Sequence, residues 1–264
     1  MFEPLSLGLS KRVRKLQQKR EREATGLFVA EGPGAVVAAV KNGELEFVIV
    51  GEDVVGPVRG LAEHASGYGI TVYEATSTAI EQLSESRTPQ GILGIARRPQ
   101  FELAQVVDKS SSLVVVLEEA RDPGNVGTII RTADAAGADA VVLAGESVDP
   151  FNAKAVRSSA GSVFNIPVVT DVSTSAVVDH LGSLSIKTVA TSLTGDTDLY
   201  DSEFLHSLQD PVAWFFGNEA HGLSKEVEAA LNQRVLLPIY GQAESLNLAI
   251  STGICLYTTL QARS

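Results

Sequence analysis

An asparagine and an arginine, six residues apart, follow a buried apolar run in a position where ligands commonly bind. The run Leu113–Leu117 reads as a strand, the turn after it is Pro123-Gly124-Asn125-Val126-Gly127, and Arg131 lies in the helix predicted for residues 126–136. A dinucleotide-binding turn needs GxGxxG and a P-loop needs GxxxxGK[ST], and the turn matches neither pattern. Six residues make about 1.7 helical turns, so the amide and the guanidinium can line one cleft. The alternative is that Asn125 only caps the helix and Arg131 is a surface residue.

A second polar segment ends the buried strand predicted for residues 212–217. It reads FFGNEAHGLS and brings Gly217 and Glu219 to the edge of the sheet. Glycine at position 217 lets a ligand approach the backbone closely. Glu219 is then a candidate partner for Arg131, and the alternative is a plain turn that carries an exposed acid.

A third segment runs from a strand into the last predicted helix, residues 246–261. Leu237-Pro238-Ile239 leaves the strand with a proline, which frees backbone groups that can bind a flat heterocycle. Ser245 and Asn247 stand at the start of the helix, where unpaired N–H groups gather and acceptors bind. The alternative is that Ser245 is only an N-cap.

Taken in order, these three segments closely resemble the three motifs of the SpoU/TrmH family, RNA ribose 2′-O-methyltransferases of the SPOUT superfamily. The chain looks most like the ribosomal RNA enzymes of that family, including the thiostrepton-resistance type. The resemblance implies S-adenosylmethionine as the cofactor, RNA as the partner and no metal. It assigns catalysis to Arg131, Asn125, Glu219, Ser245 and Asn247. It assigns cofactor binding to Leu193, Gly217, Leu237, Ile239 and Leu246.

The order of strands and helices predicts an α/β protein with two domains. The polar stretch RRPQFELAQVVDKSSS interrupts the alternation, so we expect a boundary near residue 105, with domains at 1–105 and 106–264. The second domain is expected to hold a mostly parallel sheet covered on both faces. FVAEGPGAVVAAV and RTPQGILGIARRP in the first domain resemble an L30e-like substrate-binding domain. The family resemblance further implies a deep trefoil knot in the second domain and a homodimer.

Charge and composition narrow the function further. The net charge is −11, which argues against a general polyanion binder, but Lys11–Arg22 alone carries +6. That stretch is either a basic arm that touches RNA phosphates or a solvated helix face. The single cysteine and the scattered histidines give no zinc pattern and no disulfide within the chain. We also expect no membrane segment and no secretory signal, and hence a cytoplasmic protein.

The resemblance sets a specific chemical problem, because a ribose 2′-hydroxyl is a weak acid that must lose its proton as it attacks. Arginine normally stays protonated, so two versions remain open for Arg131. In one it stays charged and grips a phosphate whose oxygen takes the proton; in the other, a dry site and the RNA let it give up its own proton. We prefer the first. The alternative functions are a transfer RNA methyltransferase, a non-catalytic RNA-binding protein and, less well matched, a dinucleotide-dependent dehydrogenase.

Overall fold

The computed structural model describes residues 2–264, which form two compact units. The first unit holds the chain up to Pro99 together with Asp149–Asn165, and the second holds Gln100–Val148 with Ile166–Ser264. The segment Asp149–Asn165 thus packs against Leu27–Glu31 and Pro33–Lys41, which precede it by more than a hundred positions in the sequence. The domain boundary near residue 105 stays a prediction.

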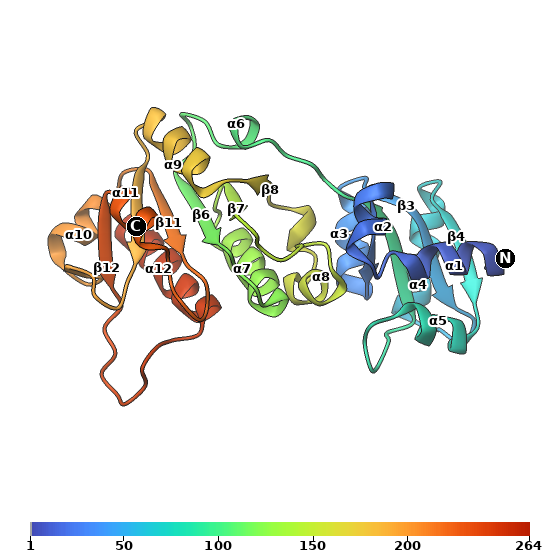
Figure 1. The fold of residues 1–264 in the computed structure, drawn as a ribbon. Coiled ribbons are helices and arrows are strands. Elements are labelled where there is room, and N and C mark those ends of the chain that lie inside the picture. Colours follow the sequence, from blue (N-terminus) through green and yellow to red (C-terminus); the bar gives the residue numbers. More distant parts are fainter. Residues whose placement is uncertain (1) are drawn as a thin grey trace. The chain divides into compact units, whose positions relative to one another are not determined.

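A mixed five-stranded sheet, ordered β1-β4-β3-β5-β2, forms the first unit (Figure 1). β4 pairs in parallel with β1 and β3, while β5 is antiparallel to both β3 and β2. The strands are β1 (Glu3–Pro4), β2 (Leu27–Glu31), β3 (Leu45–Gly51), β4 (Thr71–Ala75) and β5 (Ile92–Arg97). The helices are α1 (Leu7–Lys15), α2 (Lys19–Thr25), α3 (Pro33–Lys41), α4 (Pro57–Gly67), α5 (Ser77–Leu83), α8 (Ala153–Ser159) and the 3-10 turn η1 (Ser162–Phe164).

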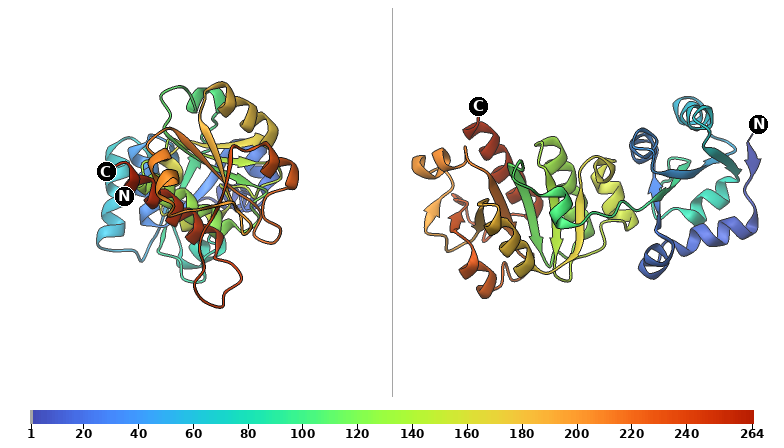
Figure 2. Two further views of the ribbon diagram at one scale, coloured as in Figure 1. Left: turned by 90° about the vertical axis from the view of Figure 1, so that its left-hand side faces the viewer. Right: turned by 90° about the horizontal axis from the view of Figure 1, so that it is seen from above.

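Helices cover both faces of this sheet, as the right-hand view of Figure 2 shows. α3 and α4 pack together on one face, and α1 and α5 pack together on the other. Val13 and Leu16 on the inner side of the α1 segment join Ile49, Ile80 and Leu93 in one buried cluster. Burying these side chains holds the polar N-terminal helices to the sheet.

Seven strands, all parallel, form the sheet of the second unit in the order β10-β12-β9-β11-β6-β7-β8. The predicted mostly parallel sheet is therefore confirmed. The strands are β6 (Leu113–Glu118), β7 (Ala140–Ala144), β8 (Val168–Val172), β9 (Lys187–Thr191), β10 (Thr197–Asp198), β11 (Val212–Phe216) and β12 (Gln233–Leu236). The helices are α6 (Leu103–Val106), α7 (Pro123–Ala135), α9 (Thr174–Ser183), α10 (Ser202–Ser207), α11 (Lys225–Ala230) and α12 (Leu248–Ala262).

The central strands of this sheet are buried on both faces. Every residue of β6 and β11 is buried, as expected for parallel strands with helices on either side. α7 packs against α12 on one face, and α9 and α11 lie on the other (Figure 2). Trp214 on β11 is fully buried and its indole N–H donates to Thr259 Oγ1 of α12 at 3.0 Å, which fixes that helix against the sheet. The carboxyl ends of β6, β11 and β12 consequently meet at one edge, where their following loops lie close together.

Candidate active site

The first loop at this edge connects β6 to α7. Asp122, with proline next to it at the first helical position, is the N-cap of α7, and its Oδ1 accepts the Asn125 backbone N–H at 2.9 Å. Asn125 therefore stands inside the first turn with its side chain free for other partners. The capping role weighed for Asn125 belongs to Asp122, and the Asp-Pro pair in the sequence was the signal for it.

The second loop, residues 217–224, follows β11 and folds back on itself. Asn218 and Gly222 exchange two backbone hydrogen bonds of 3.0 and 2.8 Å, and Gly222 has a φ of 71°, which glycine adopts without strain. A Cβ at Gly217 would come within 2.0 Å of the Gly222 carbonyl carbon. The chain's own turn therefore lies directly against Gly217, and the approach of a ligand there stays a prediction.

Glu219 at the tip of this turn binds the first loop. Its two carboxylate oxygens accept the backbone N–H groups of Arg121 at 3.2 Å and Asp122 at 3.1 Å. Asn218 completes the contact by donating its side-chain amide to the Glu119 carbonyl at 2.9 Å. These bonds join the loop after β6 to the loop after β11.

Two opposing effects set the pKa of Glu219. Partial burial, the largest effect, raises the pKa, whereas N–H donors from its own backbone, Asp122 and Arg121, together with the Asn125 amide, lower it. The donors together outweigh burial, so the pKa lies below its ordinary value and the side chain is a carboxylate at neutral pH.

Asn125 connects Glu219 to the third loop. Its amide donates to Glu219 Oε1 at 3.3 Å, and its Oδ1 accepts the Asn247 side-chain amide at 3.0 Å. Asn247 is also the N-cap of α12, because its Oδ1 accepts from Ala249 and Ile250. Three of the five predicted catalytic side chains, Glu219, Asn125 and Asn247, therefore form one hydrogen-bonded chain across three loops.

The other two predicted catalytic residues lie outside this chain of hydrogen bonds. Ser245 is exposed in the loop before α12 and, within residues 2–264, its side chain has no hydrogen-bond partner. The alternative for Ser245, that it only caps the helix, does not hold, because Asn247 provides the cap, and α12 begins at Leu248, two residues later than predicted. Arg131 is exposed on α7, and no described carboxylate pairs with it. The suggested Arg131–Glu219 pair is replaced by the contacts of Glu219 with Asn125 and the loop amides.

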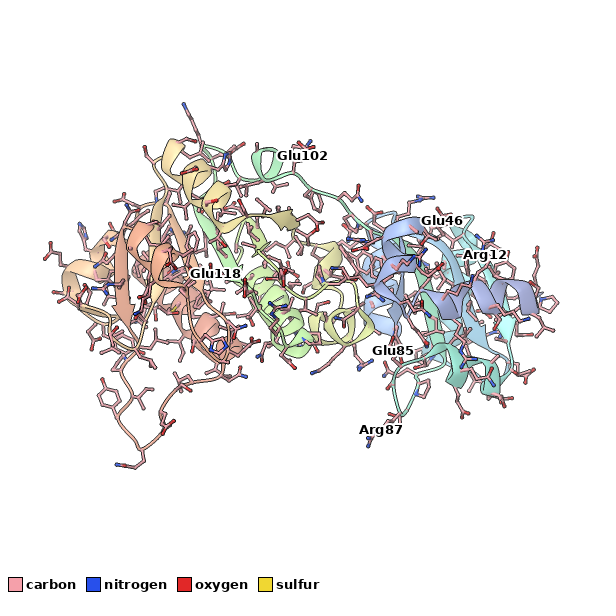
Figure 3. All side chains as sticks on the ribbon, viewed as in Figure 1. Arg12, Glu46, Glu85, Arg87, Glu102 and Glu118 are labelled. Atoms are coloured by element: carbon pink, nitrogen blue, oxygen red, sulfur yellow. The ribbon has the colours of Figure 1, made fainter. Side chains whose placement is uncertain are left out.

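Glu118, a buried carboxylate that the sequence analysis missed, supports the same edge. It is the last residue of β6 and accepts Ser224 N–H at 3.0 Å, Ser224 O–H at 3.3 Å and Thr174 O–H at 3.4 Å (Figure 3). Ser224 caps α11 directly after the 217–224 loop. Glu118, at the end of β6, accepts an N–H group from the 217–224 loop, and Glu219 in that loop accepts N–H groups from the loop after β6. The two carboxylates therefore hold these loops together.

The third loop, residues 237–247, extends away from the sheet between β12 and α12 (Figure 1). Among the described residues, no backbone group of positions 237–246 has a backbone partner, so its donors and acceptors are available. Leu193 and Leu246 expose apolar side chains, while Leu237 and Ile239 are half-buried. A Cβ at Gly195 would come within 2.6 Å of Leu236 N, so the loop after β9 lies directly against the end of β12.

Two features are absent from the part of the chain that the structure describes: a cluster of metal ligands and a helix able to span a membrane. Residues 2–264 contain no group of three or more His, Cys, Asp or Glu side chains that could hold a metal ion. The same residues include no helix with the length and hydropathy needed to cross a membrane.

The seven-stranded parallel sheet makes this an α/β protein, and the site at its edge brings together the three segments that resemble methyltransferase motifs. Residues 112–257 match the SpoU rRNA Methylase family, and residues 10–94 match the MRM3-like substrate binding domain. The chain belongs to the SpoU rRNA methylase family, which confirms the resemblance drawn from the motifs.

Relatives of known name agree over nearly the whole chain. It is 34% identical over 244 residues to the 23S rRNA (guanosine(2553)-2′-O)-methyltransferase RlmP of Bacillus subtilis (strain 168), covering 92% of each protein. It is 34% identical to the AdoMet-bound rRNA methyltransferase from Sinorhizobium meliloti, with a TM-score of 0.84 over 98% of this chain and 97% of that one. It is 26% identical to the SpoU methyltransferase AviRb from Streptomyces viridochromogenes in complex with AdoMet, with a TM-score of 0.85 over 96% and 98%.

Proposed function

We propose that this protein transfers a methyl group from S-adenosylmethionine to a ribose 2′-hydroxyl of ribosomal RNA. The observation that carries the proposal is the hydrogen-bonded chain Glu219–Asn125–Asn247, because it brings together one side chain from each of the three family motifs. The named relatives act on 23S rRNA, and two similar structures contain AdoMet. These relatives support ribosomal RNA over transfer RNA and an enzyme over a passive RNA-binding protein.

The residues around the third loop fit the cofactor. Unpaired N–H and C=O groups at 237–246 can bond the edges of an adenine, and Leu193 and Leu246 offer apolar surface to its faces. We assign cofactor binding to Leu193, Gly217, Leu237, Ile239 and Leu246. When bound, S-adenosylmethionine supplies a methyl group on a positively charged sulfur. The trefoil knot implied by the family resemblance stays a prediction.

The chain's own residues would align and deprotonate the hydroxyl. Arg131 is exposed and unpaired with any described carboxylate, so its guanidinium can bind the phosphate next to the target ribose with two N–H donors. As the ribose oxygen forms its bond to the methyl carbon and the carbon–sulfur bond breaks, its proton passes to an oxygen of that phosphate. Asn125, held by Glu219 and Asn247, is placed to orient the sugar, and Ser245 is proposed to reach it from the third loop. Positioning supplies much of the acceleration in such a mechanism.

Arg131→Ala tests this assignment. The variant should lose methyl transfer to deproteinised ribosomal RNA while S-adenosylmethionine binding, measured by calorimetry, stays nearly unchanged. Arg97→Ala removes an exposed arginine of the first unit and should transfer methyl groups normally. Arg131→Lys is not a conservative change, since lysine lacks the planar fork. An Arg131→Ala enzyme that keeps more than about a tenth of wild-type turnover, a barrier change under roughly 1.4 kcal/mol, would remove Arg131 from the mechanism.

We also propose a homodimer that works in the cytoplasm. α12 exposes Ile250 and Tyr257, which are seven residues or about two turns apart, so these two large apolar side chains form a stripe on one outward side of the helix. A second copy of the chain would bury this stripe. Ile250→Glu should convert the dimer into a monomer by light scattering, and a wild-type protein that elutes as a monomer at micromolar concentration would contradict the proposal.

A further inference from the structure

Glu118 is a buried carboxyl group whose position is explained neither by the hydrophobic core nor by an ion pair. It is the last residue of β6 and is 8% exposed. Among residues 2–264, no lysine, arginine or histidine forms an ion pair with it. Acidic side chains are rarely this buried without such a partner, because taking a polar group out of water costs free energy. The presence of Glu118 in the sheet therefore needs an explanation other than packing.

The alternation of side chains along β6 decides which way Glu118 points. Residues two apart in a strand share one face of the sheet. Val114 and Val116 belong to the apolar cluster that also contains Val177 and Leu181 of α9. Glu118 continues this row, so it points to the face of the sheet that α9 and α11 cover. A valine or leucine would extend the apolar row without burying a polar group.

Three donors on this face converge on Glu118. Its Oε2 accepts the Ser224 backbone N–H at 3.0 Å, and its Oε1 accepts the hydroxyls of Ser224 at 3.3 Å and Thr174 at 3.4 Å. Ser224 is the N-cap of α11, and Thr174 is the first residue of α9. One carboxyl group thus joins the end of β6 to the starts of two helices.

Glu219 holds the same loop from its other end. Its carboxylate accepts the N–H groups of Arg121 and Asp122, which precede α7 on the opposite face of the sheet (Figure 2). Between Glu219 and Ser224 the loop is closed by the two backbone hydrogen bonds of Asn218 with Gly222. The 217–224 loop is therefore attached to the β6 segment at both of its ends.

The β6 side of this attachment is fixed as well. Glu119 has a φ of 50°, its N–H donates to the Ala144 carbonyl at 3.1 Å, and its carbonyl accepts the Asn218 amide at 2.9 Å. A non-glycine residue keeps such a conformation only where its surroundings hold it. The sharp turn at Glu119 lets Glu118 face α11 while the N–H groups of the next residues face Glu219.

From this arrangement we infer that Glu118 is a positioning residue for methyl transfer, which holds the 217–224 loop where Glu219 can orient Asn125. The inference rests on the proposed function, in which Asn125 orients the sugar. Without an acceptor at position 118, the end of the loop can move away from β6, and the hydrogen bond from Asn125 to Glu219 lengthens. A displacement of about 1 Å at a reacting centre costs up to about a hundredfold in rate.

A simpler role for Glu118 is to stabilise α9 and α11 alone. Each role makes a different prediction for a folded variant that lacks the acceptor. The stabilising role lowers the free energy of unfolding and leaves kcat unchanged. The positioning role lowers kcat in the folded enzyme, and it leaves S-adenosylmethionine binding unchanged because the third loop is not attached to Glu118.

The test compares two variants of similar size in the full chain. Glu118→Gln keeps an acceptor for the Ser224 N–H, and its NH₂ group can donate to the two hydroxyl oxygens. Glu118→Leu leaves that N–H unpaired. With deproteinised ribosomal RNA, Glu118→Leu should lower kcat by about tenfold or more, and Glu118→Gln should recover most of it. The Kd for S-adenosylmethionine, measured by calorimetry, should stay within about twofold in both.

Hydrogen exchange supplies a measurement that does not depend on activity. In Glu118→Leu, the amide hydrogens of Arg121 and Asp122 should exchange about tenfold faster than in the wild type, because Glu219 no longer holds them. The amide of Trp214, in the middle of β11, should keep its wild-type rate.

A second pair of variants keeps the inference testable if Glu118→Leu does not fold. Ser224→Ala removes a cap and a donor to Glu118, whereas Ser173→Ala removes only the cap of α9. Ser224→Ala should lower kcat about threefold more than Ser173→Ala, as expected for the loss of one hydrogen bond.

Four results would overturn the inference: wild-type kcat in Glu118→Leu, unchanged exchange at Arg121 and Asp122, a glutamine variant as impaired as the leucine variant, or equal kcat for the two serine variants. A wild type that methylates no RNA, while exchange at Arg121 and Asp122 still depends on Glu118, would instead refute the proposed function. The attachment of the 217–224 loop by Glu118 would then stand without a role in methyl transfer.

Discussion

Asn125 uses both ends of its side-chain amide, donating to Glu219 at 3.3 Å and accepting from Asn247 at 3.0 Å. Only a side chain with one donor and one acceptor can satisfy both neighbours at once. Aspartate has the same shape but accepts only, and it would set a second carboxylate beside Glu219. The identity of this residue is therefore fixed by hydrogen bonding as well as by size.

Asn125→Asp should lower the free energy of unfolding by about 1 kcal/mol and abolish methyl transfer, because like charges repel at this distance. Adding Glu219→Gln should recover part of the stability, since amide and carboxylate then exchange places. Urea unfolding of the four proteins gives the coupling energy directly. Additive effects of the two substitutions would show that these side chains do not interact.

Glu219 should make stability depend on acid pH. Its pKa in the folded protein lies below the ordinary value of 4.5, so its contribution is full above that value and is lost as the pH falls through the lower, folded pKa. Glu219→Gln should thus be less stable than the wild type at neutral pH, and its free energy of unfolding should fall less steeply as the pH is lowered. Urea midpoints from neutral pH down to about pH 3 measure this. Glu226→Gln, at an exposed position on α11, serves as the control. If the urea midpoints of Glu219→Gln and the wild type fell equally with pH, the expectation would be contradicted.

Glu119 has a φ of 50° directly before the loop that binds Glu219, a conformation that costs a non-glycine residue about 1 kcal/mol. Its ion pair with Arg121, 3.4 Å long and half-exposed, contributes little. Glu119→Gly should leave stability unchanged or raise it by up to about 1 kcal/mol, while Glu119→Val should lower it. Glu146→Gly, where φ is not positive, should be destabilising. If Glu119→Gly lost as much stability as Glu146→Gly, the backbone at Glu119 would be unstrained.

Thr259→Val should destabilise the protein by about 1–3 kcal/mol, because it leaves the buried indole N–H of Trp214 without its acceptor. The neighbouring Thr258→Val is the matched control: Thr258 is buried, and its hydroxyl makes no hydrogen bond to another described residue. Thermal unfolding of both variants measures the difference. Equal melting temperatures would show that the indole finds another partner.

Much of the fold follows from local sequence signals. The strands predicted at Leu113–Leu117 and at residues 212–217 occur within one residue of those bounds, as β6 and β11, because continuous apolar runs mark them. Short elements without such signals, among them β1, β10 and α10, were not predicted. Asp149–Asn165 joins the first unit through the buried Arg22–Asp149 pair and through Phe151 and Phe164, which pack on Phe28, and no local pattern reveals contacts over that sequence separation.

The candidate site was predictable as a set of segments but less so as a set of contacts. Motif order brought together Asn125, Glu219 and Asn247, which do form hydrogen bonds. Ser245 and Asn247 were equally good capping residues on sequence alone, and only backbone geometry selected Asn247. Glu118 was missed because a carboxylate at the end of an apolar strand gives no sign of the N–H and O–H groups that the fold places around it.

Cys255 lies fully buried within α12, and this burial raises the pKa of its thiol well above the ordinary value. Maleimide chemistry, which needs a thiolate within reach of solvent, will therefore bypass the native sulfur. A cysteine introduced at Tyr240, whose side chain is 91% exposed, then carries a fluorophore or a spin label at a single defined position. The third loop can be followed spectroscopically in the otherwise native chain as nucleoside ligands are added.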